Sequence, residues 1–271
     1  NSSNWDEKSR ELTISFSNTT SATSSETENQ THDKTKDIQN LQSILNYFAV
    51  IKNSMSPEEQ KILSELGITG DMKYYQKRVG QIDRDLGKNI KFITPLSKRE
   101  KRKQEIIEEI EQIKAKMPSN IEIIKKQEYI KNTLTTPLEQ IIKKYTDARK
   151  ININNRAIKR LAENNKRLQD IISVSTKTAH INIEYNQTNE EKDITLVSKE
   201  ITLKNNTYNT FIEYIPEELE SEEIQFRIDA EKLSKNIYEI KNKNLQNNTI
   251  IYTIEGHIPI DKIKQTQTIL Y

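Results

Sequence analysis

The sequence contains no cysteine, so disulfide bonds, zinc–thiolate sites and catalysis by a thiol are excluded. Glycine is also scarce, with 5 residues in 271, against an average of about 7% in proteins. Phosphate-binding loops are built from closely spaced glycines, and the chain contains neither a Walker loop nor a dinucleotide-binding fingerprint. The lack of cysteine does not place the protein inside or outside the cell.

No run of apolar residues approaches the about 20 that a membrane-spanning helix requires. Charge is nearly balanced, with 42 Lys and Arg against 40 Asp and Glu. Nucleic-acid-binding proteins usually carry a basic surplus, so a net charge of +2 argues against a nucleic-acid partner. His32, His180 and His257 are isolated and show no metal-ligand pattern. We therefore expect no enzymatic activity, metal, cofactor or small-molecule substrate.

What the sequence does contain is a change in the spacing of its apolar residues near Val174. Before it they recur every three or four residues, as on one face of a helix, and after it they alternate, as in a half-buried strand. We therefore expect an α+β protein, in which residues 175–271 fold independently. Its three parts are a flexible Ser/Thr-rich segment at 1–34, a helical bundle or stalk at 35–174 and an antiparallel β-sandwich at 175–271.

Capping residues mark the expected helices. Ser56-Pro57-Glu58-Glu59 supplies a cap, a proline at the first helical position and a glutamate at the third. Gly67 then ends this helix in a left-handed turn. Other helices are expected to begin at Thr35, Ser97 and Thr136, and the last to run from Asn154 to Ser173. Lys91–Ile93 and Ile121–Ile123 are expected to be short strands or extended connectors.

A further helix repeats apolar residues at 3-4-3-4 spacing, the heptad pattern of a seam that packs against one partner helix. This seam consists of Met72, Tyr75, Val79, Ile82 and Leu86. Two heptads are too short for an isolated coiled coil, so the partner is another helix of this chain or a second copy of it. The other amphipathic helices of the chain favour a partner within it.

Six Asn-x-Ser/Thr sequons are candidate sites of N-glycosylation: Asn1, Asn18, Asn29, Asn186, Asn205 and Asn247. All of them lie in the N-terminal segment or in expected β turns, where a glycan can be accommodated. Turns are rich in Asn and Thr in any case, so ordinary turn residues are an equal alternative.

Two charged runs have both a functional and a structural interpretation. Glu217–Glu223 suits a cation site or a docking patch, but also the first turn of a short helix. Lys98–Lys103 suits phosphates or anionic lipid head groups. The acidic residues that follow it favour a solvated helix face with ion pairs four residues apart.

The segment Asp193–Asn206 leads into Phe211–Leu219, which contains Glu213-Tyr214-Ile215-Pro216. This stretch resembles the β-domain of archaeal secreted or membrane-anchored surface proteins. In these, a strand ends in an E-x-I-P-K type segment, and a later strand similar to Thr249–Gly256 closes the domain. The resemblance covers about 80 residues, from Lys177 to His257. Two features depart from it: Glu217 replaces the usual lysine, and Lys241–Leu245 lacks the usual Asp-Pro and tryptophan.

The resemblance implies an immunoglobulin-like sandwich outside the cell, often before a membrane anchor, and implies no catalytic residues. We therefore expect a non-enzymatic structural, spacer or adhesion protein of the cell surface, acting by association with a protein partner or with itself. The alternatives are an accessory subunit of a membrane-bound complex and an intracellular helical adaptor. The start at Asn1 is compatible with a removed signal segment or with trimming, and the chain with a fragment of a longer anchored protein.

Overall fold

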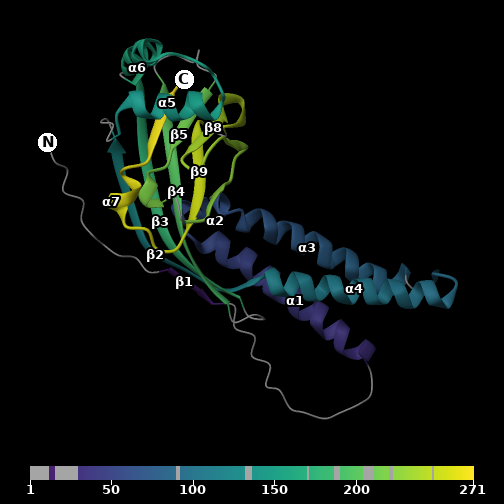
Figure 1. Cartoon of the computed structure of the whole chain (residues 1–271). Helices are drawn as coiled ribbons and strands as arrows, with labels where there is room; N and C mark the ends of the chain where they lie inside the picture. The colour runs from purple at the N-terminus through teal and green to yellow at the C-terminus, as the bar shows by residue number, and fades with distance from the viewer. Residues whose placement is uncertain are drawn as a thin grey trace. The chain divides into compact units, whose positions relative to one another are not determined.

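The computed structural model describes residues 12–15, 30–89, 92–131, 136–169, 171–185, 190–203, 210–219, 222–245 and 247–271. Within these ranges the chain is an α+β protein with seven α-helices and ten strands in two sheets (Figure 1). It divides into two compact units. The helical unit comprises Leu12–Glu122 and Asn182–Lys192, and the β unit comprises Ile123–Ile181 and Asp193–Tyr271 among the described residues.

The helical unit contains α1 (Gln30–Ser54), α2 (Pro57–Glu65), α3 (Ile68–Arg84) and α4 (Leu96–Lys116). A π-helical turn at Asp85–Asn89 follows α3. The apolar stripes of the helices are buried: Ile38, Leu41, Leu45, Phe48 and Met55 on and just after α1, and Ile106, Ile110 and Ile113 on α4. α3 packs against α1, α2 and α4.

The predicted start of α2 is confirmed. The Ser56 hydroxyl accepts a hydrogen bond of 3.3 Å from the backbone N–H of Glu59. The Glu59 carboxylate in turn accepts one of 2.9 Å from the backbone N–H of Ser56. Gly67, with φ of 81°, separates α2 from α3 as expected.

The six-stranded sheet has the order β1-β2-β3-β4-β9-β6, and the four-stranded sheet the order β10-β5-β8-β7. The strands of the first are β1 (Leu12–Ser15), β2 (Pro118–Lys131), β3 (Ile172–Tyr185), β4 (Glu190–Leu203), β9 (Thr249–Glu255) and β6 (Ile224–Phe226). Those of the second are β10 (Gln267–Leu270), β5 (Thr210–Tyr214), β8 (Ile237–Lys241) and β7 (Ala230–Lys232). β4 and β9 pair antiparallel, as do β5 and β8.

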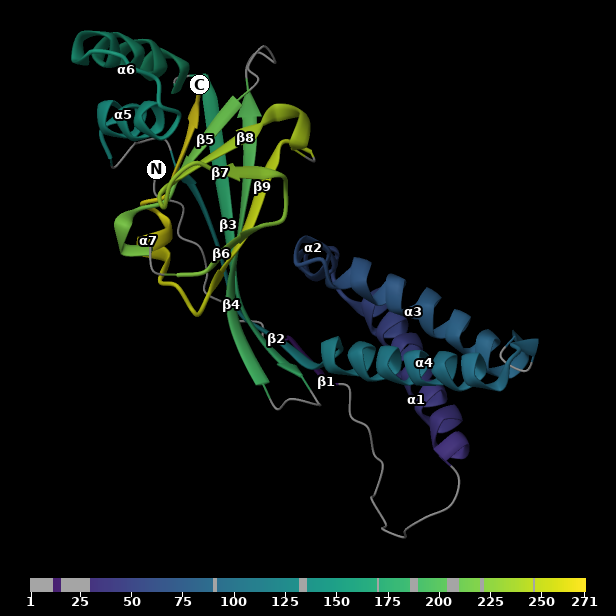
Figure 2. The same cartoon turned by 45° about the vertical axis from the view of Figure 1, so that its right-hand side comes forward.

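The β unit is layered. One apolar core joins β4 and β9 to β5, β8 and β10, through residues such as Val197, Phe211, Ile240 and Tyr252. The opposite side of the four-stranded sheet packs on α5 (Leu138–Ala148), and α5 packs on α6 (Asn155–Gln169). Figure 2 shows these two helices beside β5 and β8. The short helix α7 (Ile260–Ile263) precedes β10.

Several predicted boundaries are wrong. β2, 14 residues long, lies inside the segment expected to be helical. The last helix ends at Gln169 rather than Ser173, because β-branched and hydroxyl side chains dominate from Ile172 onward and favour β3. α5 and α6 belong to the β unit, so the expected division at 174/175 does not coincide with the compact units.

The N-terminal boundary also differs. α1 begins at Gln30, so residues 30–34 are helical rather than part of a flexible segment. Extending an existing helix by a few polar residues costs little once its apolar stripe has nucleated it, and this explains the difference. Residues 1–11 and 16–29 of the expected flexible segment lie outside the described residues.

Candidate functional site

Two charged side chains lie inside the β unit, between its sheets. In β4, Val197, Lys199 and Ile201 alternate and share a face, and the two apolar members belong to the inter-sheet core. In β5 and just beyond it, Phe211, Glu213 and Ile215 also alternate and share a face, and Phe211 and Ile215 belong to the same core from the other sheet. Lys199 is only 1% exposed and Glu213 is fully buried. The alternation of the two strands therefore places a cation and an anion opposite each other in an apolar interior.

Lys199 and Glu213 form an ion pair that neighbouring side chains complete. Lys199 Nζ donates to Glu213 Oε1 and lies 3.4 Å from Thr268 Oγ1. The Tyr252 hydroxyl donates to Glu213 Oε1 at 3.2 Å, and the Thr268 hydroxyl donates to Glu213 Oε2 at 2.6 Å. The carboxylate therefore accepts three hydrogen bonds, which compensates much of the cost of burying its charge.

The network continues to α7. The Tyr252 hydroxyl lies 3.4 Å from Thr266 Oγ1, which in turn donates to the carbonyl oxygen of Ile263 at 2.8 Å. Tyr129 of β2 donates to the same carbonyl oxygen at 3.2 Å. This buried group, which we call the inter-sheet network, thus joins both sheets and the short helix that precedes the last strand.

Burial sets the ionisation of this network. It lowers the pKa of the Lys199 ammonium group, and the adjacent negative charge of Glu213 opposes that change. Burial also raises the pKa of the Tyr252 hydroxyl well above its usual value, and the Glu213 charge adds to the effect. For Tyr129, burial raises the pKa to about 12. Both tyrosines are therefore neutral hydrogen-bond donors at physiological pH.

A second charged cluster fixes α5 to the outer side of the four-stranded sheet. Glu239 of β8 accepts hydrogen bonds at Oε2 from the Tyr145 hydroxyl at 2.7 Å and from Arg149 Nε at 3.0 Å. Lys241 Nζ lies 2.6 Å from the other carboxylate oxygen. Burial raises the pKa of Glu239, but the hydrogen bonds from Lys241, Tyr145 and Arg149 outweigh it and hold the pKa at about 2. Arg149 also binds both carboxylate oxygens of Glu231.

The structure places one sequon, Asn247, among the described residues. It is exposed and lies in a turn immediately before β9, where Asn247 and Asn248 have φ values of 52° and 54°. The hydroxyl of Thr249 donates to the Asn247 carbonyl oxygen at 3.2 Å. Asn1, Asn18, Asn29, Asn186 and Asn205 lie outside the described residues.

The predicted seam lies on α3 and the turn after it. Met72, Val79 and Ile82 are buried, at 4%, 0% and 1% exposure, and Tyr75 and Leu86 are partly buried. Because α3 packs on three helices of the same chain, the buried part of the seam has its partners within the chain.

Two of the histidines and both charged runs make contacts with neighbouring side chains of the same chain. The rings of His180 and His257 lie 5.2 Å apart, and His257 Nε2 is 3.3 Å from Asp193 Oδ1. Glu217 begins a 3₁₀ turn and pairs with Lys144 at 2.8 Å. In the basic run, Lys103 pairs with Glu100 at 2.9 Å. Within the described ranges, no group of three or more His, Cys, Asp or Glu side chains is arranged to hold a metal ion.

Sequence reasoning missed the inter-sheet network, because a lysine in a strand is ordinarily a solvent-facing residue. The sequence did contain a signal. Apolar residues occur on both faces of β4, with Ile194 and Leu196 on one and Val197 and Ile201 on the other, so the strand is buried on both sides.

None of the described helices combines the length and the apolar content that crossing a bilayer requires. Comparison with protein-family models, with curated proteins and with solved structures finds no match for this chain.

Proposed function

We propose that this chain is a non-enzymatic structural, spacer or adhesion protein of the cell surface, in which the β unit is an immunoglobulin-like sandwich and the helical unit a helical bundle or stalk. The observation that carries the proposal is the inter-sheet network. Its most polar side chains, Lys199 and Glu213, bind each other and their neighbours. They serve as a connection between two sheets, a role suited to a load-bearing or surface-presenting domain.

A buried ion pair contributes little net stability compared with apolar residues of the same volume, but it strongly disfavours any alignment that separates the charges. In a sandwich, a slip of one residue in β4 or β5 would turn Lys199 or Glu213 to the opposite face and leave its partner unpaired. The pair therefore selects one register of the two sheets. Such selection supports a role in which a fixed domain geometry matters more than a chemical reaction.

The cell-surface location is supported by the resemblance of Lys177–His257 to archaeal surface domains and by the exposed sequon at Asn247. Peptide mass spectrometry of protein isolated from its native cells tests it directly. We expect glycan mass on the Asn247 peptide and recovery of the protein with the cell-envelope fraction. Recovery in the cytosolic fraction with all six sequons unmodified would contradict the proposal.

An accessory subunit of a membrane-bound complex is the second candidate. It is favoured by apolar side chains exposed just before α4 and at its first residue, where Phe92 is 83% and Leu96 66% exposed. Large apolar side chains exposed close together in the sequence are typical of a surface that contacts another protein. Purification from native membranes in mild detergent separates the candidates, since an accessory subunit co-purifies stoichiometrically with a larger protein. Changing Phe92 and Leu96 to serine would then release it.

A further inference from the structure

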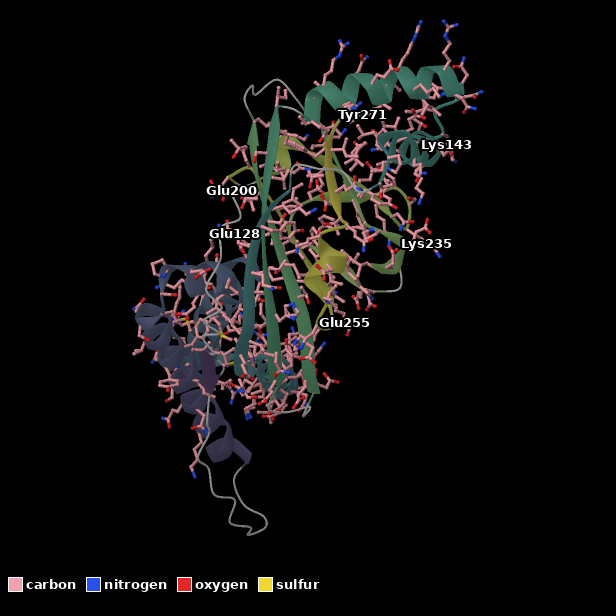
Figure 3. The ribbon with its side chains drawn as sticks, turned by 90° about the vertical axis from the view of Figure 1, so that its left-hand side faces the viewer. Glu128, Lys143, Glu200, Lys235, Glu255 and Tyr271 are labelled. Atoms are coloured by element: carbon pink, nitrogen blue, oxygen red, sulfur yellow. The ribbon has the colours of Figure 1, made fainter. Side chains whose placement is uncertain are left out.

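α6 carries basic side chains along its entire outer side. Five exposed residues, Arg156, Lys159, Arg160, Lys166 and Arg167, form this surface, which we call the α6 basic face. Glu163 is the single acidic residue of the helix. The opposite side contains the buried residues Ile158, Ala162 and Asn165 and packs on α5. Figure 3 shows nitrogen-tipped side chains extending from α6 on the side away from the rest of the β unit.

The five cations form two adjacent rows. At about 100° of rotation per residue, Arg156, Arg160 and Arg167 lie within a narrow arc, and Lys159 and Lys166 lie beside them one heptad apart. Arg156 and Arg167 are eleven residue steps apart, which is about 16 Å along the helix. A rigid helix packed on α5 thus presents an almost straight line of positive charge.

Lys144 on α5 and Arg149 just after it differ from the cations of the α6 basic face in having ion-pair partners. On α5, Lys144 pairs with Glu217, and Arg149 follows the helix and pairs with Glu231 and Glu239. None of the five has an ion-pair or hydrogen-bond partner for its side chain in the part of the chain that the structure describes. By the same rotation Glu163 lies between the two rows, so the face combines five cations with one carboxylate. This excess of positive charge in a chain whose net charge is only +2 indicates an anionic partner.

We infer that the α6 basic face binds the phosphate head groups of an anionic lipid bilayer, with the helix lying along the membrane surface. A straight row of long basic side chains on a rigid support matches a planar array of phosphates, and each cation near such a surface adds to the affinity. The face contains no aromatic residue on which the bases of a single-stranded nucleic acid stack. Ile151, in the connection that leads into α6, is 43% exposed and suits the boundary between head groups and acyl chains.

This inference does not depend on the proposed function. It is tested by co-sedimentation of the full chain with vesicles of phosphatidylcholine alone and with about one third phosphatidylglycerol. We expect binding only to the anionic vesicles, and release as the salt concentration rises, because screening weakens the attraction. Equal binding to both vesicle types, or no binding at low salt, would overturn the inference.

Substitution locates the contact. The triple variant Arg156→Gln, Arg160→Gln, Arg167→Gln keeps good helix formers at exposed positions and is expected to bind anionic vesicles about 100-fold more weakly. The matched control is Lys73→Gln, Lys77→Gln, Arg84→Gln, which removes the same charge from exposed positions of α3 at the same spacing. The control is expected to bind within about two-fold of the parent chain. Equal losses in both triple variants would mean that net charge, not the α6 basic face, governs binding.

A parallel titration with duplex DNA separates the two sources of phosphate. If the chain binds the duplex and not the anionic vesicles, and the arginine variant abolishes that binding, the partner is a nucleic acid and the lipid assignment is wrong. Circular dichroism of both triple variants establishes that they retain the helical content of the parent.

Discussion

Tyr145 of α5 donates a hydrogen bond of 2.7 Å from its hydroxyl group to Oε2 of Glu239 in β8. Arg149, one turn further along, binds the same oxygen at 3.0 Å. The helix is thus held on the sheet by two donors that share one buried acceptor, in addition to the apolar cluster to which Ile141 and Ile212 both belong. The docking of α5 therefore depends on the charge of Glu239.

Stability of the β unit is expected to fall in acid because of Glu239. Its pKa is about 2 in the folded chain against 4.5 for an unperturbed glutamate. A carboxyl group with a lowered folded-state pKa stabilises fully above the unfolded value, and the contribution is lost as pH falls from 4.5 towards about 2. Urea unfolding at a series of pH values should show this loss in the parent chain and a flatter profile in Glu239→Gln. The exposed control Glu218→Gln should keep the parent profile.

Breaking the inter-sheet ion pair from one side is expected to cost about 3–5 kcal/mol of unfolding free energy, because the remaining charge is buried without its partner. Lys199→Met and Glu213→Leu are the single variants, and both are expected to melt at much lower temperature than the parent. The double variant should be more stable than either, since it leaves no unpaired charge.

A surface pair provides the comparison for that experiment. Lys103 and Glu100 are partly exposed, and Lys103→Met is expected to cost less than about 1 kcal/mol. Additive effects of the two core substitutions would show that Lys199 and Glu213 do not interact energetically, contrary to the geometry.

Val79→Asp is expected to destabilise the helical unit by about 3 kcal/mol, because Val79 is fully buried and a carboxylate there has no partner. Lys77→Asp, at an exposed position of the same helix, is the control and should change stability by less than about 1 kcal/mol. Thermal unfolding gives the stability and light scattering gives the mass. Dissociation of an oligomer whose monomer stays folded would instead assign the seam to contacts between chains.

Residues 123–271 are expected to fold as a cooperative unit, whereas 175–271 are not. Without α5, the outer side of the four-stranded sheet exposes Ile212, Tyr214, Ile237 and Ile269. The shorter fragment should therefore bind a hydrophobic dye strongly and aggregate, while the longer one should do neither. A well-dispersed, monomeric fragment of 175–271 would show that α5 and α6 are dispensable.

Local signals predicted the elements well where one rule dominated. The cap at Ser56 and the glycine at Gly67 gave both ends of α2. Alternation gave the strands around Ile212 and Tyr252. The long strand β2 was missed beyond Ile123, because the four consecutive polar residues Lys125–Glu128 interrupt the alternation there and the flanking sequence has helical spacing. Pairing with β3, which is distant in sequence, decides the conformation of such a segment.

The two buried charged clusters could not be predicted from short stretches of sequence, because they too depend on contacts between distant segments. Lys199 and Glu213 face each other only because two sheets stack, and Glu239 meets Tyr145 only because α5 covers β8. No fixed separation in the sequence predicts either of these contacts. The α+β class follows from the spacing of the apolar residues alone. The position of α5 and α6 in the β unit does not, because it depends on the packing of α5 on the four-stranded sheet and of α6 on α5.

The positions of the boundaries between the two units determine what a cut in the chain separates. The boundary between the units falls inside three strands, between Glu122 and Ile123 in β2, Ile181 and Asn182 in β3, and Lys192 and Asp193 in β4. A single cut in β3 or β4 leaves the four helices covalently joined to the β unit through β2, whereas a single cut between Glu122 and Ile123 separates them from it in sequence. The helical unit is also not a continuous stretch of sequence. Release of the complete helical unit from the rest of the chain therefore requires cuts in all three strands.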